Sequence, residues 1–227
     1  MVDFANPRQS PFTFFVQIVL EFFAPTLCCH CGKVGLLLCA KCFSQITYTP
    51  LPHTVDSGTS CIPIFTVAQY DGPIRSLITS MKFLGVKAVC NYLADLAIYT
   101  TSIPPFDIIC PIPLHPKRKN ERGFDQVELI ASKLAKHLQK PCVPLLVRTK
   151  YLTAQSSVSN KQQRFARMHD IYKINEKYSQ KVRHIYPIKI LLVDDVFTTG
   201  ATIISAAQTL NAHNPHLVIS GLCIARD

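Results

Sequence analysis

The stretch ILLVDDVFTTGATI, residues 190–203, decides the fold. Apolar residues lead into two adjacent aspartates, Asp194 and Asp195, and then into a loop of small residues and threonines. A continuous apolar run is typical of a strand buried on both faces of a parallel sheet. Ligands bind beyond the carboxyl ends of such strands. We therefore expect a strand over 188–193 with both carboxylates at its tip, then a ligand-binding turn and a helix over 200–212.

The turn after the aspartates has the residues of an anion site. Its backbone N–H groups would open the following helix, where the partial positive charge favours a phosphate. It is not a Walker loop, because it lacks the pattern G-x-x-x-x-G-K-[ST]. The two carboxylates suit the binding of sugar hydroxyls, or of Mg²⁺ through water. A sugar phosphate is the ligand that this combination predicts. The phosphate-binding residues would be Thr198, Thr199, Gly200, Ala201 and Thr202.

Apolar runs alternate with helical stretches on both sides of this motif. The expected strands are 64–72, 106–114, 143–150, 187–195 and 217–225. The expected helices are 73–84, 86–100, 124–140 and 200–212. This alternation predicts an α/β fold with a Rossmann-like parallel sheet covered on both faces.

The N-terminal part reads as a separate unit. Residues 12–23 carry polar side chains every four positions on an otherwise apolar helix, which favours packing against the main domain over a membrane surface. We expect an N-terminal helix and a cysteine module within 1–50, a linker over 51–62, and the main domain over 63–227.

The cysteine module has the spacing C-x2-C-x7-C-x2-C. Two such pairs complete a four-thiolate shell, so the spacing predicts a structural Zn²⁺ site that would fold this short segment. The neighbouring Cys29 and His30 are competing ligands, and reactive or disulfide cysteines are the alternative. The predicted metal ligands are Cys28, Cys31, Cys39 and Cys42.

Composition limits the class of protein and its partners. The chain has 227 residues, of which 48% are hydrophobic and 17% charged, as in a folded globular protein. Its net charge of +10 attracts polyanions, although a merely basic surface is the alternative. No signal peptide is evident, and the N-terminal apolar run is too short for a membrane span. We therefore expect a cytoplasmic protein with reduced thiols.

The motifs together resemble the ComF (competence protein F) family of type I phosphoribosyltransferase-like proteins. The resemblance rests on the cysteine pairs, on YDGPIRSLITSMKFLG, on CPIPLHPKRKNERGFDQ and on LLVDDVFTTGAT, in that order. It departs at Asp125, where the family usually has Asn, and near RMHDIYKIN. It implies a site for 5-phosphoribosyl-1-pyrophosphate (PRPP), with Asp194 and Asp195 at the ribose and the threonine-glycine loop around the 5′-phosphate.

Basic residues lie near this site in the sequence. They suit either the pyrophosphate of PRPP, with Mg²⁺ present, or a nucleic-acid backbone, and a solvated charge run is the alternative. Aromatic residues such as Phe124 among these charges would suit single-stranded DNA. Lys133, Lys136 and Lys140 are interpreted as a solvated face. The predicted basic site residues are Lys117, Arg118, Arg122, Lys82 and Arg164.

Two functions follow from the resemblance and the site. The first is an accessory protein of DNA uptake in natural transformation, which binds Mg-PRPP and single-stranded DNA and meets uptake machinery such as a helicase or channel. The second is an active phosphoribosyltransferase with an unknown, nucleobase-like acceptor, for which the sequence shows no clear general base. A purely structural partner protein is a third, weaker hypothesis.

Overall fold

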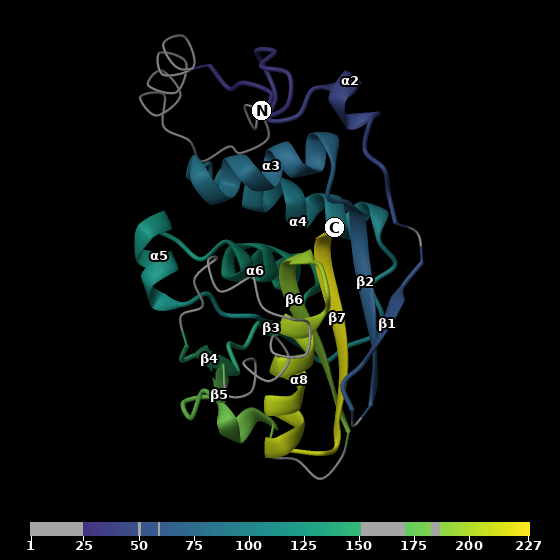
Figure 1. Cartoon of the computed structure of the whole chain (residues 1–227), viewed down its shortest axis with the longest axis vertical. Coiled ribbons are helices and arrows are strands. Elements are labelled where there is room, and N and C mark those ends of the chain that lie inside the picture. Colours follow the sequence, from purple (N-terminus) through teal and green to yellow (C-terminus); the bar gives the residue numbers. More distant parts are fainter. Residues whose placement is uncertain (1–24, 50, 59, 151–170, 183–186) are drawn as a thin grey trace.

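The computed structural model describes residues 25–49, 51–58, 60–150, 171–182 and 187–227. Its centre is a five-stranded sheet in the order β1-β2-β7-β6-β3 (Figure 1). All neighbouring strands are parallel except β1, which pairs antiparallel with β2 at the edge. The strands are β1 His53–Asp56, β2 Cys61–Gln69, β3 Ile108–Pro111, β6 Ile188–Phe197 and β7 Leu217–Arg226.

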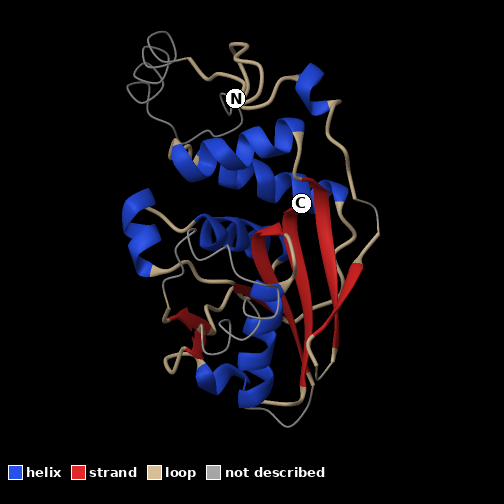
Figure 2. Ribbon diagram, viewed as in Figure 1, coloured by secondary structure: helices blue, strands red, loops and turns tan. Residues whose placement is uncertain are grey.

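Helices cover both faces of this sheet (Figure 2). One face packs against α3 Gly72–Phe83, α4 Ala88–Thr100 and α6 Gln126–Leu138, and the other packs against α8 Ala201–His213. The strands alternate accordingly. Leu191 and Val193 of β6 lie in the first core, and Ile190 and Leu192 lie in the second. The expected α/β class with a mostly parallel sheet is confirmed.

Residues 143–150 do not join the central sheet as expected. They contain β4 Leu146–Arg148, which pairs antiparallel with β5 Tyr172–Ile174 in a separate two-stranded sheet. The chain does start along the edge of β3, where Cys142 makes a parallel bridge with Ile109. Pro144 follows two residues later and has no N–H group to continue that ladder, so the chain leaves the sheet there.

The segment 51–62, expected as a linker, contains all of β1 and the start of β2. The short helices α2 Ala40–Phe43 and α5 Pro116–Arg122 and the 3₁₀ helix η2 Ser179–Val182 were also not expected. The domain boundaries themselves stay a prediction, and the expected helix over 12–23 lies outside the described residues. Among the helices that the structure describes, none has the length and apolar character of a membrane span.

The cysteine module is continuous with the main core. Leu38 and Ile46 of the module are buried in the same cluster as α3, α4 and α6. Figure 1 shows the module beside α3, at the end of the molecule opposite α8. The module therefore gains part of its stability from the main domain rather than from its own few apolar residues.

Candidate functional site

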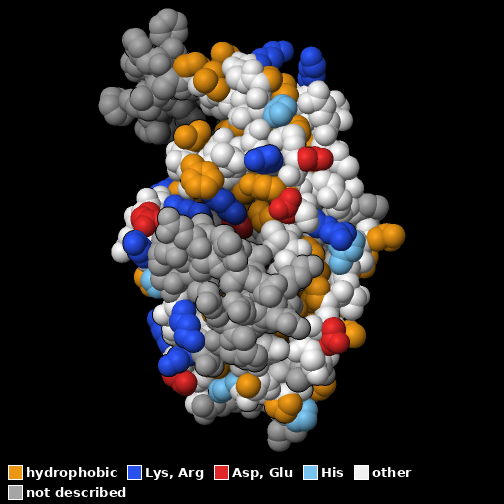
Figure 3. All heavy atoms as spheres, viewed as in Figure 1, with side chains coloured by type: hydrophobic (Ala, Val, Ile, Leu, Met, Phe, Trp, Pro, Cys, Tyr) orange, Lys and Arg blue, Asp and Glu red, His pale blue; other side chains and the backbone are white. Residues whose placement is uncertain are grey.

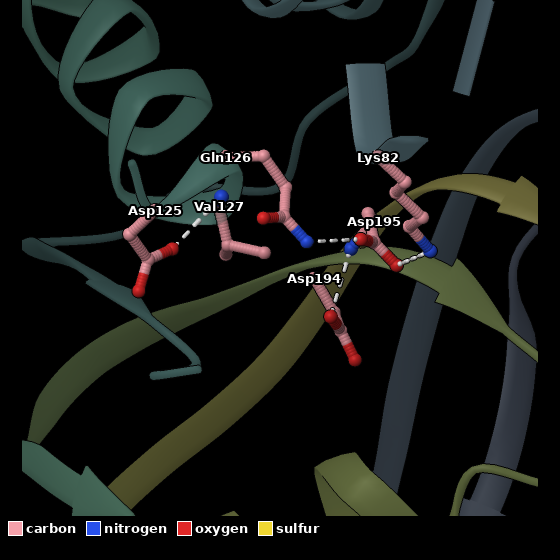
Figure 4. Close-up of polar contacts among 6 residues, drawn as sticks. All are labelled: Lys82, Asp125, Gln126, Val127, Asp194 and Asp195. Atoms are coloured by element: carbon pink, nitrogen blue, oxygen red, sulfur yellow. Dashed lines mark hydrogen bonds and ion pairs between the residues drawn. The ribbon is translucent and has the colours of Figure 1, made fainter. Parts of the chain in front are cut away.

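Strand β6 continues to Phe197, so both aspartates lie within the strand and not beyond its tip. Asp194 pairs with Cys223 of the neighbouring strand β7, which keeps the ladder intact at this position. Adjacent residues of a strand point to opposite faces of its sheet. Asp195 therefore points toward α3 and α6, and Asp194 points toward the α8 side (Figure 4). The sequence interpretation, which placed both carboxylates together at a strand tip, is corrected on this point.

Asp195 is held by two side chains from distant elements. Its Oδ1 atom lies 2.8 Å from Nζ of Lys82, at the end of α3, and its Oδ2 atom accepts a 2.9 Å hydrogen bond from Nε2 of Gln126, at the start of α6. Burial acts to raise the pKa of Asp195, but Lys82 and Gln126 outweigh it and leave that pKa below its usual value. Asp195 is therefore an ionised carboxylate, and each of its two oxygen atoms already has a side-chain partner.

Asp194 is in a different electrostatic state. Its Oδ1 atom accepts a 2.8 Å hydrogen bond from the backbone N–H of Asp195, and this contact is local to the strand. Burial, followed by the negative charge of Asp195, raises the pKa of Asp194 to about 7. The positive charges of Lys82 and Arg148 oppose this shift. Asp194 is thus a carboxyl group that changes its protonation near neutral pH.

Asp194 shares a small cleft with the predicted phosphate turn. Besides Asp194, the cleft is lined by Val196, Phe197, Thr198, Gly200, Thr202 and Ile203. Thr198 and Thr199 are exposed, and Gly200 precedes the first turn of α8 as its N-cap, without any side-chain cap bond. The first N–H groups of α8, from Ala201 on, therefore have no side-chain cap, an arrangement that suits the binding of an anion.

Both the backbone conformation and the close neighbours at position 200 require a glycine. Its φ of 77° lies in the left-handed region, and a Cβ atom there would lie 2.9 Å from Cγ1 of Val55 in β1. His53 of the same strand stacks on Phe197, with ring centroids 6.5 Å apart. Strand β1, which the sequence analysis placed in a linker, thus braces the turn from outside.

The predicted basic residues divide into two groups. Lys82 contacts Asp195, and Arg122 lies close enough to feel its charge: burial lowers the pKa of Arg122 while the charge of Asp195 opposes this change. The Nη1 atom of Arg122 is buried and has no hydrogen-bond partner among the described residues. Arg118 lies one helical turn before it on α5, whereas Lys117 is exposed. Arg164 lies outside the described residues.

The segment around these residues is the helix α5, which the sequence analysis did not predict. Pro116 starts α5, His115 accepts a 3.2 Å hydrogen bond from the N–H of Lys117 as N-cap, and Gly123 ends the helix with φ 73°. Figure 3 shows Lys and Arg side chains gathered on the visible face between α3 and α5. Phe124 is buried in the core, so it is not the exposed stacking residue that the sequence suggested.

Gln126 is a site residue that sequence analysis missed. It is 1% exposed, and its Oε1 atom has no hydrogen-bond partner among the described residues. The signal was a polar residue at a buried position directly after the N-cap Asp125. Asp125 accepts backbone N–H groups of Val127 and Glu128 with one oxygen and of Leu114 with the other. A carboxylate fits this acceptor-only position, which explains why Asp stands where the ComF pattern usually has Asn.

The four predicted cysteines come together at the N-terminal module. Their sulfur atoms all lie within 4.8 Å of one another, and Sγ of Cys31 is 3.6 Å from Sγ of Cys39. Two sulfurs bound tetrahedrally to one zinc, each about 2.3 Å away, would be about 3.8 Å apart. His30, one of the competing ligands, directs its Nδ1 atom to Oγ of Ser76 in α3 at 2.9 Å. The cluster could hold a metal ion with the four sulfurs as its ligands.

Two thiols of this cluster favour the thiolate state, whereas burial, followed by hydrogen bonds to the neighbouring cysteines, raises the pKa of Cys42 to about 12. Burial acts to raise the pKa of Cys28, but hydrogen bonds from the backbone of Cys31, Cys39 and His30 outweigh it and lower that pKa to about 6. Hydrogen bonds from Cys42 lower the pKa of Cys39 as well. Metal binding requires deprotonated cysteines, so the donor set fits a structural zinc.

Comparison with known sequences shows which proteins this α/β chain is similar to. The chain is 25% identical over 210 residues to DNA utilization protein YhgH of Escherichia coli K12, covering 88% of this chain and 89% of that protein. It is 26% identical over 198 residues to competence protein F of Haemophilus influenzae, covering 81% and 83%. Competence protein ComFC of Bacillus subtilis is 25% identical over 165 residues, covering 71% and 63%. The resemblance to the ComF family is confirmed.

Other comparisons add little to this assignment. No family model matches the chain. Solved structures with a similar trace include the adenine phosphoribosyltransferase of Thermoanaerobacter pseudethanolicus, at 15% identity over 63% of this chain and 83% of that one, with a TM-score of 0.38. The enzyme of Leishmania tarentolae is also 15% identical, covers 71% and 76%, and has a TM-score of 0.34. These scores are too low to carry a conclusion about chemistry.

Proposed function

We propose that this protein takes part in DNA uptake, binds Mg-PRPP at the cleft between Asp194 and the start of α8, and binds single-stranded DNA on its basic surface. The names of the relatives, DNA utilization protein and competence protein, support the role in DNA uptake. The observation that supports the ligand is that Asp194 and the turn 198–202 line one cleft.

In this proposal the 5′-phosphate of PRPP lies on the N–H groups at the start of α8. The helix end is electropositive, and the hydroxyls of Thr198 and Thr202 add donors. Asp194 accepts hydrogen bonds from the ribose hydroxyls, and a bound phosphoribosyl group would favour its ionised form. Mg²⁺ would be held by the pyrophosphate of the ligand and by water on Asp194, since carboxylate and phosphate oxygens are its preferred ligands.

The basic side chains supply the second half of the ligand site. Arg122 is partly buried, feels the charge of Asp195, and has a buried Nη1 atom without a hydrogen-bond partner among the described residues, which a phosphate oxygen could supply. Arg118 lies on the same face of α5. The pyrophosphate of PRPP would occupy this position, while Lys117 at the exposed side of α5 would meet the backbone of DNA.

Zinc in the cysteine module has a structural role in this proposal. The four-sulfur shell leaves no open position for a substrate, and the module packs on α3, the helix that supplies Lys82. Loss of the metal would therefore loosen the support of α3 as well as the module.

An active phosphoribosyltransferase is the second candidate, and the pKa of about 7 at Asp194 favours it. A general base works best when its pKa lies near the working pH, and the sequence alone offered no such group. Asp194 in its ionised form would take the proton that the acceptor loses as it bonds to the anomeric carbon, while pyrophosphate leaves with the electron pair of the bond that breaks. Release of pyrophosphate from PRPP with a panel of nucleobases would support this activity.

Calorimetric titration with Mg-PRPP tests the ligand. Wild type should bind, and the double variant Asp194→Asn, Asp195→Asn should show no heat of binding. Asp71→Asn is the matched control, because Asp71 is exposed at the far end of α3 and makes no side-chain cap bond. Unchanged affinity in the double variant would refute both candidate functions. A transformation assay of the same variants tests the role in uptake.

A further inference from the structure

The outer surface between α4 and α6 is a groove of about 580 Å³ away from the aspartates. Its lining residues on α6 repeat at helical spacing, while Ile130 and Leu134 on the other side of the helix are buried in the core. The groove is therefore the solvent-facing side of α6 together with the neighbouring side of α4. It is lined by Asn91, Leu129, Ser132, Lys133, Lys136 and His137.

Positive charge predominates in this groove. Nζ of Lys133 lies 3.4 Å from Oδ1 of Asp95, but both side chains are about 40% exposed, so solvent screens the pair. Lys136 is exposed and makes no ion pair with any described residue. Asp95 is the one acidic residue of α4, and Glu128 of α6 is paired with Lys119 of α5 at 2.9 Å. The groove thus keeps a cationic excess for an anionic ligand.

An exposed aromatic ring contacts His137, the groove residue that follows Lys136 in the chain. Tyr99 of α4 is 74% exposed, and its ring meets His137 of α6 edge to face, with centroids 5.7 Å apart. The histidine restricts the orientation of the tyrosine while most of the ring stays open to solvent. A fixed aromatic ring among cations is the combination on which single-stranded nucleic acids bind, by stacking a base and neutralising phosphates.

We propose that the α4–α6 groove is a binding site for single-stranded DNA, with phosphates on Lys133 and Lys136 and a base stacked on Tyr99. This inference rests on the DNA part of the proposed function and places DNA binding on a surface of α6. The sequence analysis had interpreted the lysines of that surface as a solvated face. The pair between Lys119 and Glu128 joins the near end of the groove to α5. A bound strand would follow α6, which rises about 1.5 Å per residue, toward the basic residues beside the PRPP cleft.

Fluorescence anisotropy with a labelled oligothymidylate, measured on the full chain over a series of salt concentrations, tests this site. The double variant Lys133→Gln, Lys136→Gln should make the negative slope of log affinity against log salt shallower by about 1.4, since each phosphate contact contributes about 0.7. Tyr99→Ala should weaken binding about fivefold or more, and Tyr99→Phe should bind like wild type because the ring remains. Lys173→Gln with Lys181→Gln removes equal charge from exposed positions on β5 and η2 and is the control.

The outcomes separate this proposal from the wider one. Loss of affinity in the groove variants, with the control unchanged, supports the groove. Equal binding by the groove variants, the control and wild type overturns the groove but leaves DNA binding elsewhere on the chain. A wild-type chain that retains no oligonucleotide at low salt overturns both the groove and the DNA part of the proposed function.

Discussion

Strand β6 directs two adjacent aspartates to opposite faces of the sheet, where their pKa values shift in opposite directions. On the α3 and α6 side, Asp195 is tied to Lys82 and Gln126 and its pKa is lowered. On the α8 side, Asp194 has a pKa of about 7 and opens to the phosphate turn. Identical neighbours in sequence thus acquire different roles, because a strand directs them into different environments. Asp195 binds side chains of α3 and α6, and Asp194 is the carboxylate that we propose for the ligand.

Single substitutions of the two aspartates should separate these roles most strongly. Asp194→Asn removes the carboxylate that faces the turn, so we expect Mg-PRPP affinity to fall at least about a hundredfold with little change in melting temperature. Asp195→Asn should instead lower the melting temperature, because it leaves Lys82 largely buried without a counter-charge. Calorimetric titration and thermal unfolding of both variants make the comparison. Equal effects on affinity and stability would contradict the division of roles.

Lys82→Met should destabilise the fold by about 3 kcal/mol, because it leaves Asp195 ionised and buried with only Gln126 as partner. Lys119→Met is the matched control. The pair between Lys119 and Glu128 has the same close geometry, but both side chains are 49% exposed, so its loss should cost below about 1 kcal/mol. Urea unfolding of the two variants measures the difference, and similar midpoints would mean that the Asp195 contact has no special weight.

Gly200→Ala should lower stability by about 2 kcal/mol and weaken Mg-PRPP binding. Alanine at φ 77° is strained, and its Cβ would also collide with Val55. Gly58→Ala provides the comparison, because Gly58 has a similar φ of 82° but nothing lies within 4 Å of its Cβ position. Unfolding experiments should show a larger loss for Gly200. If the two losses are equal, β1 does not brace the turn.

The affinity for Mg-PRPP should depend on pH through Asp194. With a pKa of about 7, Asp194 is mostly protonated at pH 6 and mostly ionised at pH 8. Affinity should therefore rise by about tenfold over that range, and the rise should be absent in Asp194→Asn. Stability should change in the opposite sense. The raised pKa means that the folded state binds the proton of Asp194 more tightly than the unfolded state does. The free energy of unfolding should therefore decrease as the pH rises from about 4 through 7. Denaturant titrations at several pH values check the sign.

Local patterns in the sequence predicted much of the fold. The continuous apolar run before Asp194, the small-residue turn and the cysteine spacing each reflect neighbours in the chain, and each indicated its element correctly. The states of the aspartates depend on residues far away. Gln126 and Lys82 lie 69 and 113 positions from Asp195, and no local pattern connects them.

Some features that the sequence analysis missed have a local signal in the sequence, but the effect of that signal depends on neighbouring strands. The opposite directions of the two aspartates follow from strand alternation, and recognising that β6 runs past them would have been enough. Strand β1 is short and polar, and it forms only because it pairs with the edge of β2. Pro144, which diverts β4 from the sheet, was present in the sequence, but its effect depends on the neighbouring edge of β3.

A crystal structure of the protein with Mg-PRPP would show which of the two aspartates binds the ligand. We expect the 5′-phosphate on the backbone N–H groups of residues 198–202, the ribose hydroxyls on Asp194, and Asp195 still bound to Lys82 and Gln126. A ligand whose ribose lies on the Asp195 side, or whose phosphate lies away from the start of α8, would contradict it.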